Sequence, residues 1–517
     1  MSFQGREAAL LNQARFGLVL SLVAAALLRF WALTQGIPFG VQVDEPEVLL
    51  RAVRMMKTGD LNPHFFDYPT LYMYLQALVA AGRFLVGAMR GEWSALAQAP
   101  PEAFYLWARA VTAALGTATV WLIYRTGIRW GRRVALLAAV MFAVMPLHVR
   151  ESHFVLTDVP VTFMVMLTLL LSLRAHERST LAAFALAGAA AGLAGATKYN
   201  GVLALFLPLL ACALTRAVRP TRIAAAAIVI VSMVGAFLVA APYTVLDLPT
   251  FLNQFARLSG EYRADLAVPE PIWIIYLKHL RNAFGYPGSA IVVAGLLVGA
   301  WKMAVGPDRF RWALVTLFPL LYFRFISNQH IFYGRYLLPL LPFLSLLGAV
   351  AVVATVDFMR HAKLPQGAKN SVTVLMTVIA IGPPSYTSIS FNVNAAKVWT
   401  TEEAYNWIIR EIPPGSKVTM ESRQILLPSN YQTRYLAQLR LHPFEQYVSE
   451  GVEYLIASSQ CYGAYLDPQN GGPDRYPVEY ADYMRIFSQT QELVRFTPSG
   501  DHPGPEVRIL KIVRTSP

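Results

Sequence analysis

Charged side chains are scarce in this sequence. Only 15% of its 517 residues are Asp, Glu, Lys or Arg, whereas soluble domains contain about 25%. This shortage excludes an ordinary soluble protein, and the 55% content of hydrophobic residues indicates a polytopic membrane protein with a more polar C-terminal stretch.

Cysteine is nearly absent as well. Cys212 lies in an apolar segment and Cys461 in the polar tail, so we expect no disulfide and no cysteine-based metal site. The sequence also has no internal repeat, no low-complexity segment and no phosphate-binding glycine loop. Secondary transporters are often built from repeats, so the missing repeat argues against that class.

The net charge of +13 does not indicate a nucleic-acid-binding protein. Lysines and arginines fall in short loops between apolar segments, where they set membrane orientation. The N-terminal segment 1–15 is short and contains Arg6 and Arg15. The apolar segment that follows it has no clear cleavage site. We therefore expect a retained signal anchor.

Eleven segments are long and apolar enough to predict membrane-spanning helices. They are residues 16–34, 104–124, 134–148, 155–173, 181–196, 200–215, 223–241, 288–304, 312–326, 337–356 and 372–390. Together they define a membrane domain, 1–390, followed by a tail, 391–517. Short β-rich runs at 417–421, 453–458 and 507–513 alternate in the tail with helical patterns at 404–412 and 480–491. The tail is therefore predicted to be a small soluble α/β domain.

The status of a twelfth apolar segment, 70–89, decides the topology. If it does not span and the N-terminus is cytoplasmic, the inner segments hold seventeen basic residues and the short outer loops hold three, Arg150, Lys198 and Arg335. We therefore place 70–89 at the outer membrane interface. The loops 35–103 and 242–287 and the tail then lie outside the cytoplasm, and the length and aromatic content of 242–287 suit a lid.

Two adjacent carboxylates, Asp44 and Glu45, follow the first apolar segment and precede Pro46. A carboxylate at the edge of a bilayer costs free energy and often has a functional role. The alternative is that both residues favour the N-terminus of a helix that starts at Pro46. The residues alone leave both interpretations open.

Three more polar turns fall on the predicted outer side. The first, 148–160, contains Arg150, which could hold a phosphate, and Asp158. Asp158 could take part in the site or could only cap the helix that follows it. The second, 196–201, contains Lys198, which could neutralise an anionic substrate or extend to the headgroups. The third, 328–339, contains Arg335, which could bind a lipid phosphate or anchor a helix.

These motifs, in this order, resemble the C-type integral-membrane glycosyltransferases. The resemblance covers about residues 10–390 and rests on the Asp-Glu pair, Tyr68-Pro69-Thr70-Leu71-Tyr72, the Arg-Glu-Ser to Asp-x-Pro turn, the Thr-Lys-Tyr turn and Gly334-Arg335-Tyr336-Leu337-Leu338-Pro339. The chain is most similar to the group that contains protein O-mannosyltransferases and the aminoarabinose transferase of lipid A (glycosyltransferase families 39 and 83). Thr70 departs from the second proline of many relatives, which affects only local loop geometry.

The resemblance implies transfer of a sugar from a polyprenyl-phosphate carrier, with or without a second phosphate, to an acceptor outside the cytoplasm. Fixed cations would meet the charge that develops on the leaving phosphate, and the expected ones are Arg150, Lys198 and Arg335. Asp44 would be the general base of an inverting displacement, and Glu45 would orient Asp44 or the acceptor. Asp158 would support this site or hold Arg150. Further substrate contacts are expected at His153, Tyr68, His330, Tyr336 and His279. A Mg²⁺ or Mn²⁺ ion at Asp44, Glu45 and Asp158 is left open and is not required.

Two rival interpretations predict other features. A transporter or flippase of lipid-linked or anionic solutes should show repeats and charges near the bilayer midplane, whereas the polar residues here gather on one side. An assembly or sensor protein that acts through its tail would leave those outer charges unexplained. The expected partners are therefore a polyprenyl-phosphate-linked sugar, membrane lipids and an extracytoplasmic acceptor that is a protein, a lipid or a glycan.

Overall fold

The computed structural model describes residues 3–37, 39, 44–215, 219–263, 270–361, 365–421, 425–468 and 472–513. The chain separates into two compact units, which are described one at a time. The helical unit consists of residues 1–33 and 48–391, and the second unit of residues 34–47 and 392–517. The sequence places the boundary at 390, and the structure adds the short segment 34–47 to the tail.

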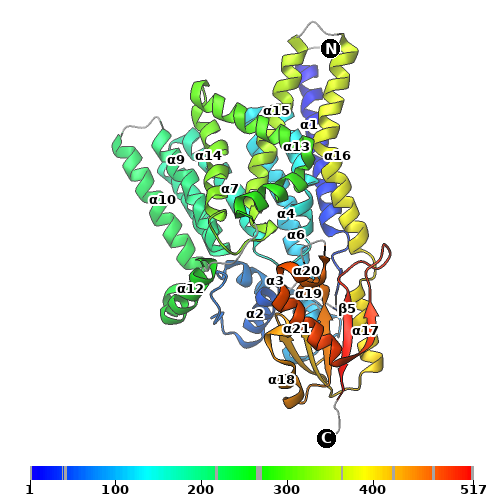
Figure 1. Cartoon of the computed structure of the whole chain (residues 1–517). Coiled ribbons are helices and arrows are strands. Elements are labelled where there is room, and N and C mark those ends of the chain that lie inside the picture. The colour runs from blue at the N-terminus through cyan, green and yellow to red at the C-terminus, as the bar shows by residue number, and fades with distance from the viewer. Residues whose placement is uncertain are drawn as a thin grey trace. The chain divides into compact units, whose positions relative to one another are not determined.

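Helices that overlap the predicted membrane segments form most of the helical unit (Figure 1). They are α1 (Phe3–Phe30), α4 (Tyr105–Gly127), α5 (Arg132–Ala143), α7 (Asp158–Arg178), α8 (Leu181–Thr197), α9 (Phe206–Leu214), α10 (Arg219–Ala240), α13 (Ile272–Val305), α14 (Arg309–Ile326), α15 (Leu341–His361) and α16 (Gln366–Ala395). Each of the eleven predicted segments overlaps one of them. Among the described residues, seven helical segments are long and apolar enough to cross a membrane, so the number eleven stays a prediction.

Further helices and turns connect these helices. They are α2 (Glu45–Thr58), α3 (Leu71–Met89), α6 (Pro146–Glu151), α11 (Tyr243–Leu246) and α12 (Leu248–Arg263), together with the 3₁₀ turns η1 (Leu96–Gln98), η2 (Pro101–Phe104), η3 (Ile128–Trp130), η4 (Tyr199–Leu205) and η5 (Gly334–Leu340). Helices α2 and α12 lie at one end of the helical bundle (Figure 1).

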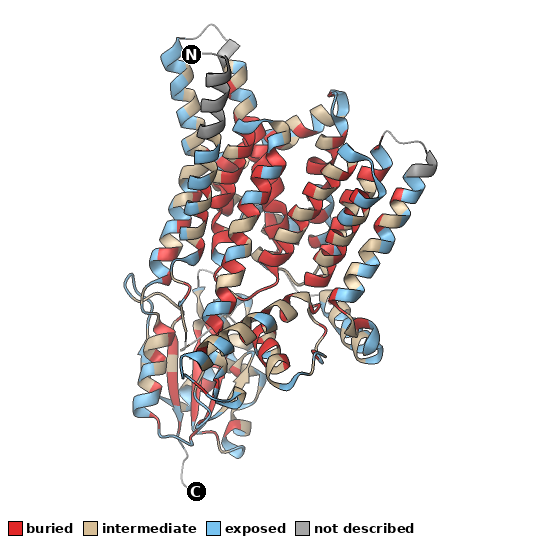
Figure 2. Ribbon diagram, turned by 180° about the vertical axis from the view of Figure 1, so that it is seen from behind, coloured by how far each residue is buried: buried red, intermediate tan, exposed pale blue. Residues whose placement is uncertain are grey.

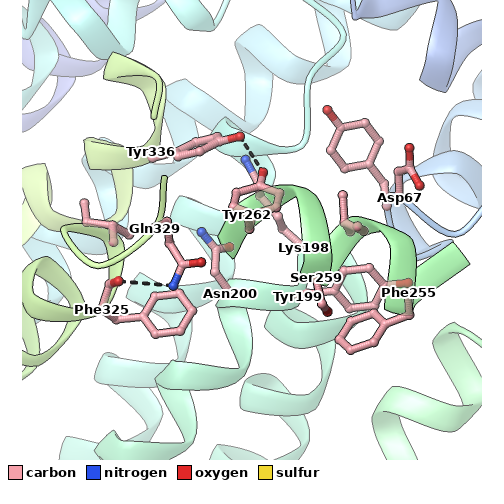
Figure 3. Close-up of a pocket in the computed structure, with 13 residues that line it drawn as sticks. Asp67, Lys198, Tyr199, Asn200, Phe255, Ser259, Tyr262, Phe325, Gln329 and Tyr336 are labelled. Atoms are coloured by element: carbon pink, nitrogen blue, oxygen red, sulfur yellow. Dashed lines mark hydrogen bonds between the residues drawn. The ribbon is translucent and has the colours of Figure 1, made fainter. Parts of the chain in front are cut away.

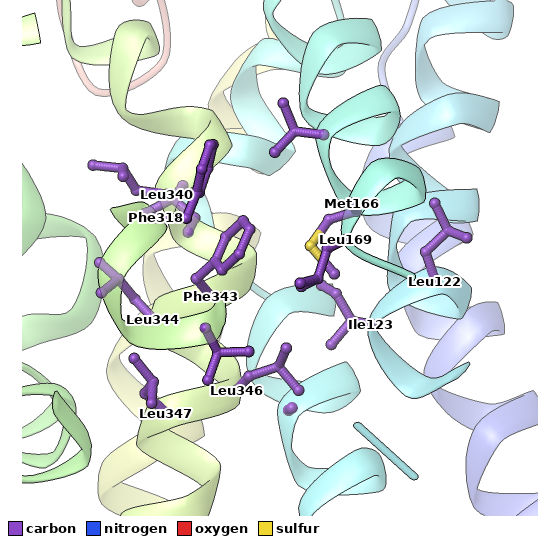
Figure 4. Packing of buried hydrophobic residues seen from close by; sticks show 14 of the residues in the cluster. Leu122, Ile123, Met166, Leu169, Phe318, Leu340, Phe343, Leu344, Leu346 and Leu347 are labelled. Atoms are coloured by element: carbon purple, nitrogen blue, oxygen red, sulfur yellow. The ribbon is translucent and has the colours of Figure 1, made fainter. Parts of the chain in front are cut away.

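The core of the bundle lies around α15, because this helix is buried on almost all sides (Figure 2). Phe343 and Leu346 of α15 face Met166 and Leu169 of α7 across the cluster (Figure 4). The backbones of helices α8 and α10 also pack closely against each other. A Cβ atom added at Gly188 would lie 2.4 Å from the carbonyl oxygen of Val229, and one at Gly192 would lie 2.2 Å from that of Met233. Small residues permit this close backbone packing of helices.

The predicted outer loop 242–287 is largely helical in the structure. It contains α11, α12 and the first part of α13, and residues 264–269 of the loop lie outside the described residues. Helix α13 breaks at Gly285, whose φ of 72° lies in the left-handed region that glycine tolerates. Pro287 follows two residues later, so the break lies where the sequence predicts the end of the outer loop and the start of the next span.

Helix α3 corresponds to the segment that decided the topology. By length and composition it could cross a membrane. The Tyr72 hydroxyl nevertheless bonds to the Thr112 hydroxyl at 2.5 Å, and the ring of Trp93, just after α3, packs on Phe104. These contacts lie at or before the first turns of α4, so α3 does not run along the length of α4. This arrangement favours the predicted interfacial position, which stays a prediction.

The second unit contains a five-stranded sheet in the order β2-β1-β3-β5-β4. The strands are β1 (Lys417–Glu421), β2 (Gln432–Leu436), β3 (Tyr454–Ser458), β4 (Thr490–Phe496) and β5 (Val507–Ile512); β1 pairs with β2 and β3 in parallel, and β5 pairs with β3 and β4 antiparallel. The helices are α17 (Thr400–Glu411), η6 (Leu439–Leu441), α18 (Phe444–Ser449), α19 (Ser459–Leu466), α20 (Gly472–Arg475) and α21 (Pro477–Ser488).

Separate apolar clusters cover this sheet. One contains α17 residues such as Ile408, and the other contains α21 residues such as Ile486. The segment 34–47 joins this unit through Phe39, whose ring packs edge-on against Tyr405 at 5.0 Å and whose carbonyl oxygen accepts from the Leu426 amide. The unit is thus the small layered α/β domain expected from the sequence, with an added N-terminal segment.

Candidate active site

Asp158 is the centre of a buried ion cluster in the helical unit. Its Oδ1 accepts a hydrogen bond from Lys198 Nζ at 2.6 Å, and its Oδ2 lies 3.6 Å from Arg335 Nε. The exposed fractions of the three side chains are only 4%, 10% and 11%. The structure therefore brings together three residues that the sequence placed in three separate outer turns.

The local sequence explains how each member reaches the cluster. Asp158 begins α7, where the helix dipole favours a negative charge. Lys198 directly follows the last residue of α8 and has an extended backbone. Arg335 lies in η5 next to Gly334, and a Cβ atom at Gly334 would lie 3.3 Å from Nδ1 of His279. Glycine at this position lets the predicted contact residue His279 approach the turn that carries Arg335.

Aromatic rings surround the two cations. Lys198 Nζ lies 4.4 Å from the centre of the Tyr336 ring, and the Arg335 guanidinium lies 4.2 Å from that of Tyr333, both within the range of cation–π attraction. The hydroxyls of Tyr336 and Tyr262 are 2.6 Å apart. Burial raises the pKa of Tyr262, so this phenol stays neutral and keeps its proton for hydrogen bonding.

A cavity of about 350 Å³ opens beside this cluster (Figure 3). Among the predicted residues, Tyr68, Lys198 and Tyr336 line it. The wall is mainly aromatic and apolar, with a few polar side chains, which is the usual character of a small-molecule site. The other lining residues are Asp67, Tyr199, Asn200, Phe255, Leu258, Ser259, Tyr262, Phe325, Ile326 and Gln329.

Helix α12 forms part of the cavity wall and is held in place by polar contacts. Arg257 pairs with Asp67, and Gln254 Oε1 accepts from the Phe66 amide at 2.7 Å. The Tyr199 hydroxyl donates to the Phe66 carbonyl oxygen at 2.8 Å. Phe66 and Asp67, which lie next to Tyr68 in the sequence, are thus held by α12 and by Tyr199.

Arg150 does not contact Asp158 through any hydrogen bond or ion pair that the described residues show. Its guanidinium pairs with the neighbouring Glu151, with Nε 2.9 Å from Oε1, and the Arg150 side chain is half exposed. The sequence offered Asp158 as a partner for Arg150, and the structure gives that carboxylate to Lys198 and Arg335 instead. The reason is geometric, since Arg150 lies on the short helix α6 and Asp158 opens the next one.

His153 is buried, and both of its ring nitrogens contact the backbone. Its ring nitrogens lie 2.8 Å from the carbonyl oxygens of Val149 and Trp31, and burial lowers its pKa although both carbonyls act to raise it. Nearby, the fully buried Arg29 donates to the carbonyls of Phe142 and Ala143 at the end of α5. These contacts join α1 to the turn that carries Arg150.

The remaining predicted residues lie in different surroundings. The amide of His330 donates to the Tyr262 carbonyl oxygen at 2.9 Å, which ties the 328–339 turn to α12. Asp44 and Glu45 belong to the second unit and stand at the start of α2, where the Asp44 carbonyl oxygen accepts from the Glu47 amide and Glu45 is buried. Their predicted meeting with Asp158 stays a prediction. Among the described residues, no group of three His, Cys, Asp or Glu side chains could hold a metal ion.

Several residues of the site were not predicted from the sequence, among them Asp67, Asn200 and Tyr262. Asn200 lies within the Thr-Lys-Tyr turn, and Tyr262 within the predicted lid, so their segments were recognised but their roles were not. The sequence alone does not indicate that Tyr262 contacts Tyr336, because only the folded loop brings the two hydroxyls together.

The fold is shared with membrane enzymes of known structure. The ArnT protein from Cupriavidus metallidurans, solved with undecaprenyl phosphate, superimposes with a TM-score of 0.55 at 14% identity over 96% of this chain and 98% of that one. The oligosaccharyltransferase AglB from Archaeoglobus fulgidus, solved with an inhibitory peptide and a dolichol-phosphate, gives 0.59 at 13% identity over 90% and 72%. The chain has the C-type glycosyltransferase fold.

The chain also matches a family model over part of its length. Residues 64–255 match the model of dolichyl-phosphate-mannose-protein mannosyltransferase. No curated protein sequence matches the chain. The resemblance inferred from the motifs is thus confirmed at the level of the fold, and the apolar helices identify a multi-pass membrane protein.

Proposed function

We propose that this C-type chain transfers a sugar from a polyprenyl-phosphate carrier to an acceptor outside the cytoplasm. The observation that supports this most directly is the buried contact of Asp158 with Lys198 and Arg335 beside an aromatic cavity. The relatives of known structure were solved with undecaprenyl phosphate or dolichol-phosphate, which makes a lipid phosphate the first ligand to test.

The chemistry of the cluster suits a phosphate leaving group. When the bond between sugar and phosphate breaks, negative charge develops on the phosphate oxygens. Cations that are already fixed in place stabilise this charge without reorganising, and they act more strongly in surroundings with little water. Asp158 orients Lys198 and Arg335 in this way, and Lys198 itself lines the cavity.

The acceptor side of the reaction needs a base. We assign this role to Asp44, with Glu45 orienting it, because a carboxylate that removes the proton of an attacking hydroxyl contributes about 10²–10⁴-fold. A single displacement would invert the configuration of the anomeric carbon. Arg150, which is half exposed, would assist at the entrance of the site. We further propose that no divalent cation is required, because two side-chain cations already contact Asp158.

The proposal is tested by a transfer reaction with purified protein in liposomes. Radiolabelled mannose on polyprenyl phosphate is the first donor, since the matching family model describes mannosyltransferases; glucose and aminoarabinose donors follow. Extracts of proteins, lipids and glycans serve as acceptors. We expect label to leave the carrier with the wild type and not with Lys198→Met. Retention of label on every carrier would refute sugar transfer, and movement of intact carrier between leaflets would instead indicate a flippase.

A further inference from the structure

One polar atom at the cavity is left without a partner. The Asn200 side chain donates from Nδ2 to the hydroxyl of Tyr322 at 2.7 Å, and that tyrosine is only 1% exposed. The other end of the same amide, Oδ1, is buried and accepts no hydrogen bond from the described residues. A buried acceptor left without a hydrogen-bond donor destabilises the folded protein. Such an atom calls for a ligand or an ordered water molecule.

The position of Asn200 connects this atom with the ion cluster. Asn200 is two residues after Lys198, and both residues line the same cavity. Figure 3 shows the Asn200 carboxamide between the side chains of Gln329 and Lys198, with Tyr262 and Tyr336 nearby. A group that bonds to Asn200 would therefore lie next to a group that bonds to Lys198.

The chemistry of an amide oxygen restricts the ligand. Oδ1 can only accept a hydrogen bond, so it needs a donor. An ionised phosphate has only acceptor oxygens, and a polyprenyl chain has neither donor nor acceptor. A sugar provides hydroxyl donors, and its apolar face fits walls made of rings such as Tyr199, Phe255 and Tyr336. A sugar joined directly to the phosphate would also be the nearest part of the donor to Lys198.

We propose that Asn200 binds a hydroxyl of the transferred sugar while Lys198 binds the phosphate of its carrier. This inference rests on the proposed function and makes it more specific. Asn200 then determines which sugar is accepted, because a donor whose hydroxyl cannot reach Oδ1 leaves a buried acceptor unpaired. Sites that are built to bind a hydroxyl discriminate strongly against ligands that lack it.

Binding measurements separate the sugar from the phosphate. The probes are decaprenyl phosphate and its mannosyl, glucosyl and aminoarabinosyl derivatives, each titrated against the full-length protein in detergent. For the preferred sugar, we expect the wild type to bind the derivative about tenfold more tightly than decaprenyl phosphate, as expected for one hydrogen bond to a buried acceptor. In Asn200→Leu this ratio should fall to about one, with the affinity for decaprenyl phosphate unchanged.

Two further variants serve as controls. Asn200→Asp keeps an acceptor oxygen at the same place and should keep most of the ratio. Thr316→Val removes another buried, unpartnered oxygen of α14 that lies outside the cavity, and should leave the ratio unchanged. If Asn200→Leu still binds the sugar derivative about tenfold more tightly than decaprenyl phosphate, the inference is overturned. The partner of Oδ1 in the wild type would then be a water molecule and not the sugar. The inference is also overturned if no sugar derivative binds the wild type more tightly than decaprenyl phosphate does. In that case the proposed function would still be supported if the wild type binds decaprenyl phosphate and Lys198→Met does not.

Discussion

Lys198 and Asp158 form a buried ion pair, 2.6 Å from Nζ to Oδ1, although forty residues and a complete helical hairpin separate them in the sequence. The pair exists because α7 begins and α8 ends at the same end of the bundle. A carboxylate on the first residue of one helix thus meets an ammonium just beyond the last residue of the next.

Removal of the Asp158 charge should destabilise the protein strongly. Asp158→Asn leaves Lys198 and Arg335 buried beside a neutral amide, and loss of one partner of a buried pair typically costs about 3–5 kcal/mol. The melting temperature by tryptophan fluorescence should fall by several degrees. Asp357→Asn, which breaks the exposed Arg133–Asp357 pair, is the matched control and should cost less than about 1 kcal/mol. Equal losses in the two variants would contradict a special role for the buried cluster.

Asp44→Asn distinguishes between catalysis and helix capping. Asparagine is about as good as aspartate at the N-cap position, so α2 and the folded protein should be retained. An amide cannot accept the proton of an acceptor hydroxyl, so sugar transfer should fall at least a hundredfold. The measurement is turnover of a labelled donor at equal amounts of folded protein. Turnover close to that of the wild type would leave Asp44 with capping alone.

Chelation should have little effect on transfer. Because Lys198 and Arg335 contact Asp158, we expect EDTA to change the rate by less than about twofold, if the phosphate charge is met by these side chains. Rates are measured in chelator, and again after addition of Mg²⁺ or Mn²⁺. A loss that the metal restores would show that a cation takes part.

Cysteine labelling tests the orientation in the membrane. In a background without Cys212 and Cys461, Arg132→Cys at the exposed start of α5 should react with an impermeant maleimide only after the membrane is opened. Ser449→Cys, exposed at the end of α18 in the tail, should react in intact cells. The opposite pattern would mean that α3 crosses the membrane and that all later loops change sides.

The stability of the α/β unit should depend on Glu421. Burial raises its pKa from 4.5 to about 7, although the amides of Leu439 and Ser458 and the hydroxyl of Tyr483 donate to it. The folded state therefore holds a proton that the unfolded state loses above pH 4.5. The contribution of Glu421 to the stability is therefore greatest below pH 4.5, falls as the pH rises to about 7 and is level above, with a total change of about 3 kcal/mol.

Hydrogen exchange of the full-length protein measures this change. After correction for intrinsic rates, β1 and β3 should be better protected at pH 5 than at pH 7.5. Glu421→Gln cannot ionise, so its protection should be nearly the same at both pH values. An equal pH dependence in the wild type and the variant would assign the effect to other groups.

Much of the ion cluster could be predicted because of the membrane itself. Short turns between apolar helices have little freedom, so polar residues in outer turns are confined to the same level. Asp158, Lys198 and Arg335 could therefore be grouped before their contacts were known. Arg150 also lies in one of these predicted turns, yet it pairs with Glu151 and not with Asp158. The depth of a residue in the membrane does not determine which neighbour its long side chain contacts.

Other features depend on tertiary contacts that leave no local pattern. Asn200 and Tyr322 come from different helices, and only packing brings them together. Strands β2 and β4 were not predicted because they are edge strands with many exposed or half-exposed residues and little apolar alternation. The segment 34–47 was assigned to an outer loop, since nothing before folding indicates that Phe39 packs on Tyr405.

The glycines of α8 link the middle of the bundle to the cavity. Helix α10, which they allow to approach, ends at Ala240, whose carbonyl oxygen accepts from the Thr70 hydroxyl next to Tyr68. A methyl group at Gly188 or Gly192 would meet the α10 backbone and displace that helix. The displacement would reach Ala240 and, through its hydrogen bond with Thr70, the segment that carries the cavity residue Tyr68. We therefore expect Gly188→Ala and Gly192→Ala to lower the proposed sugar transfer, although neither glycine lines the cavity.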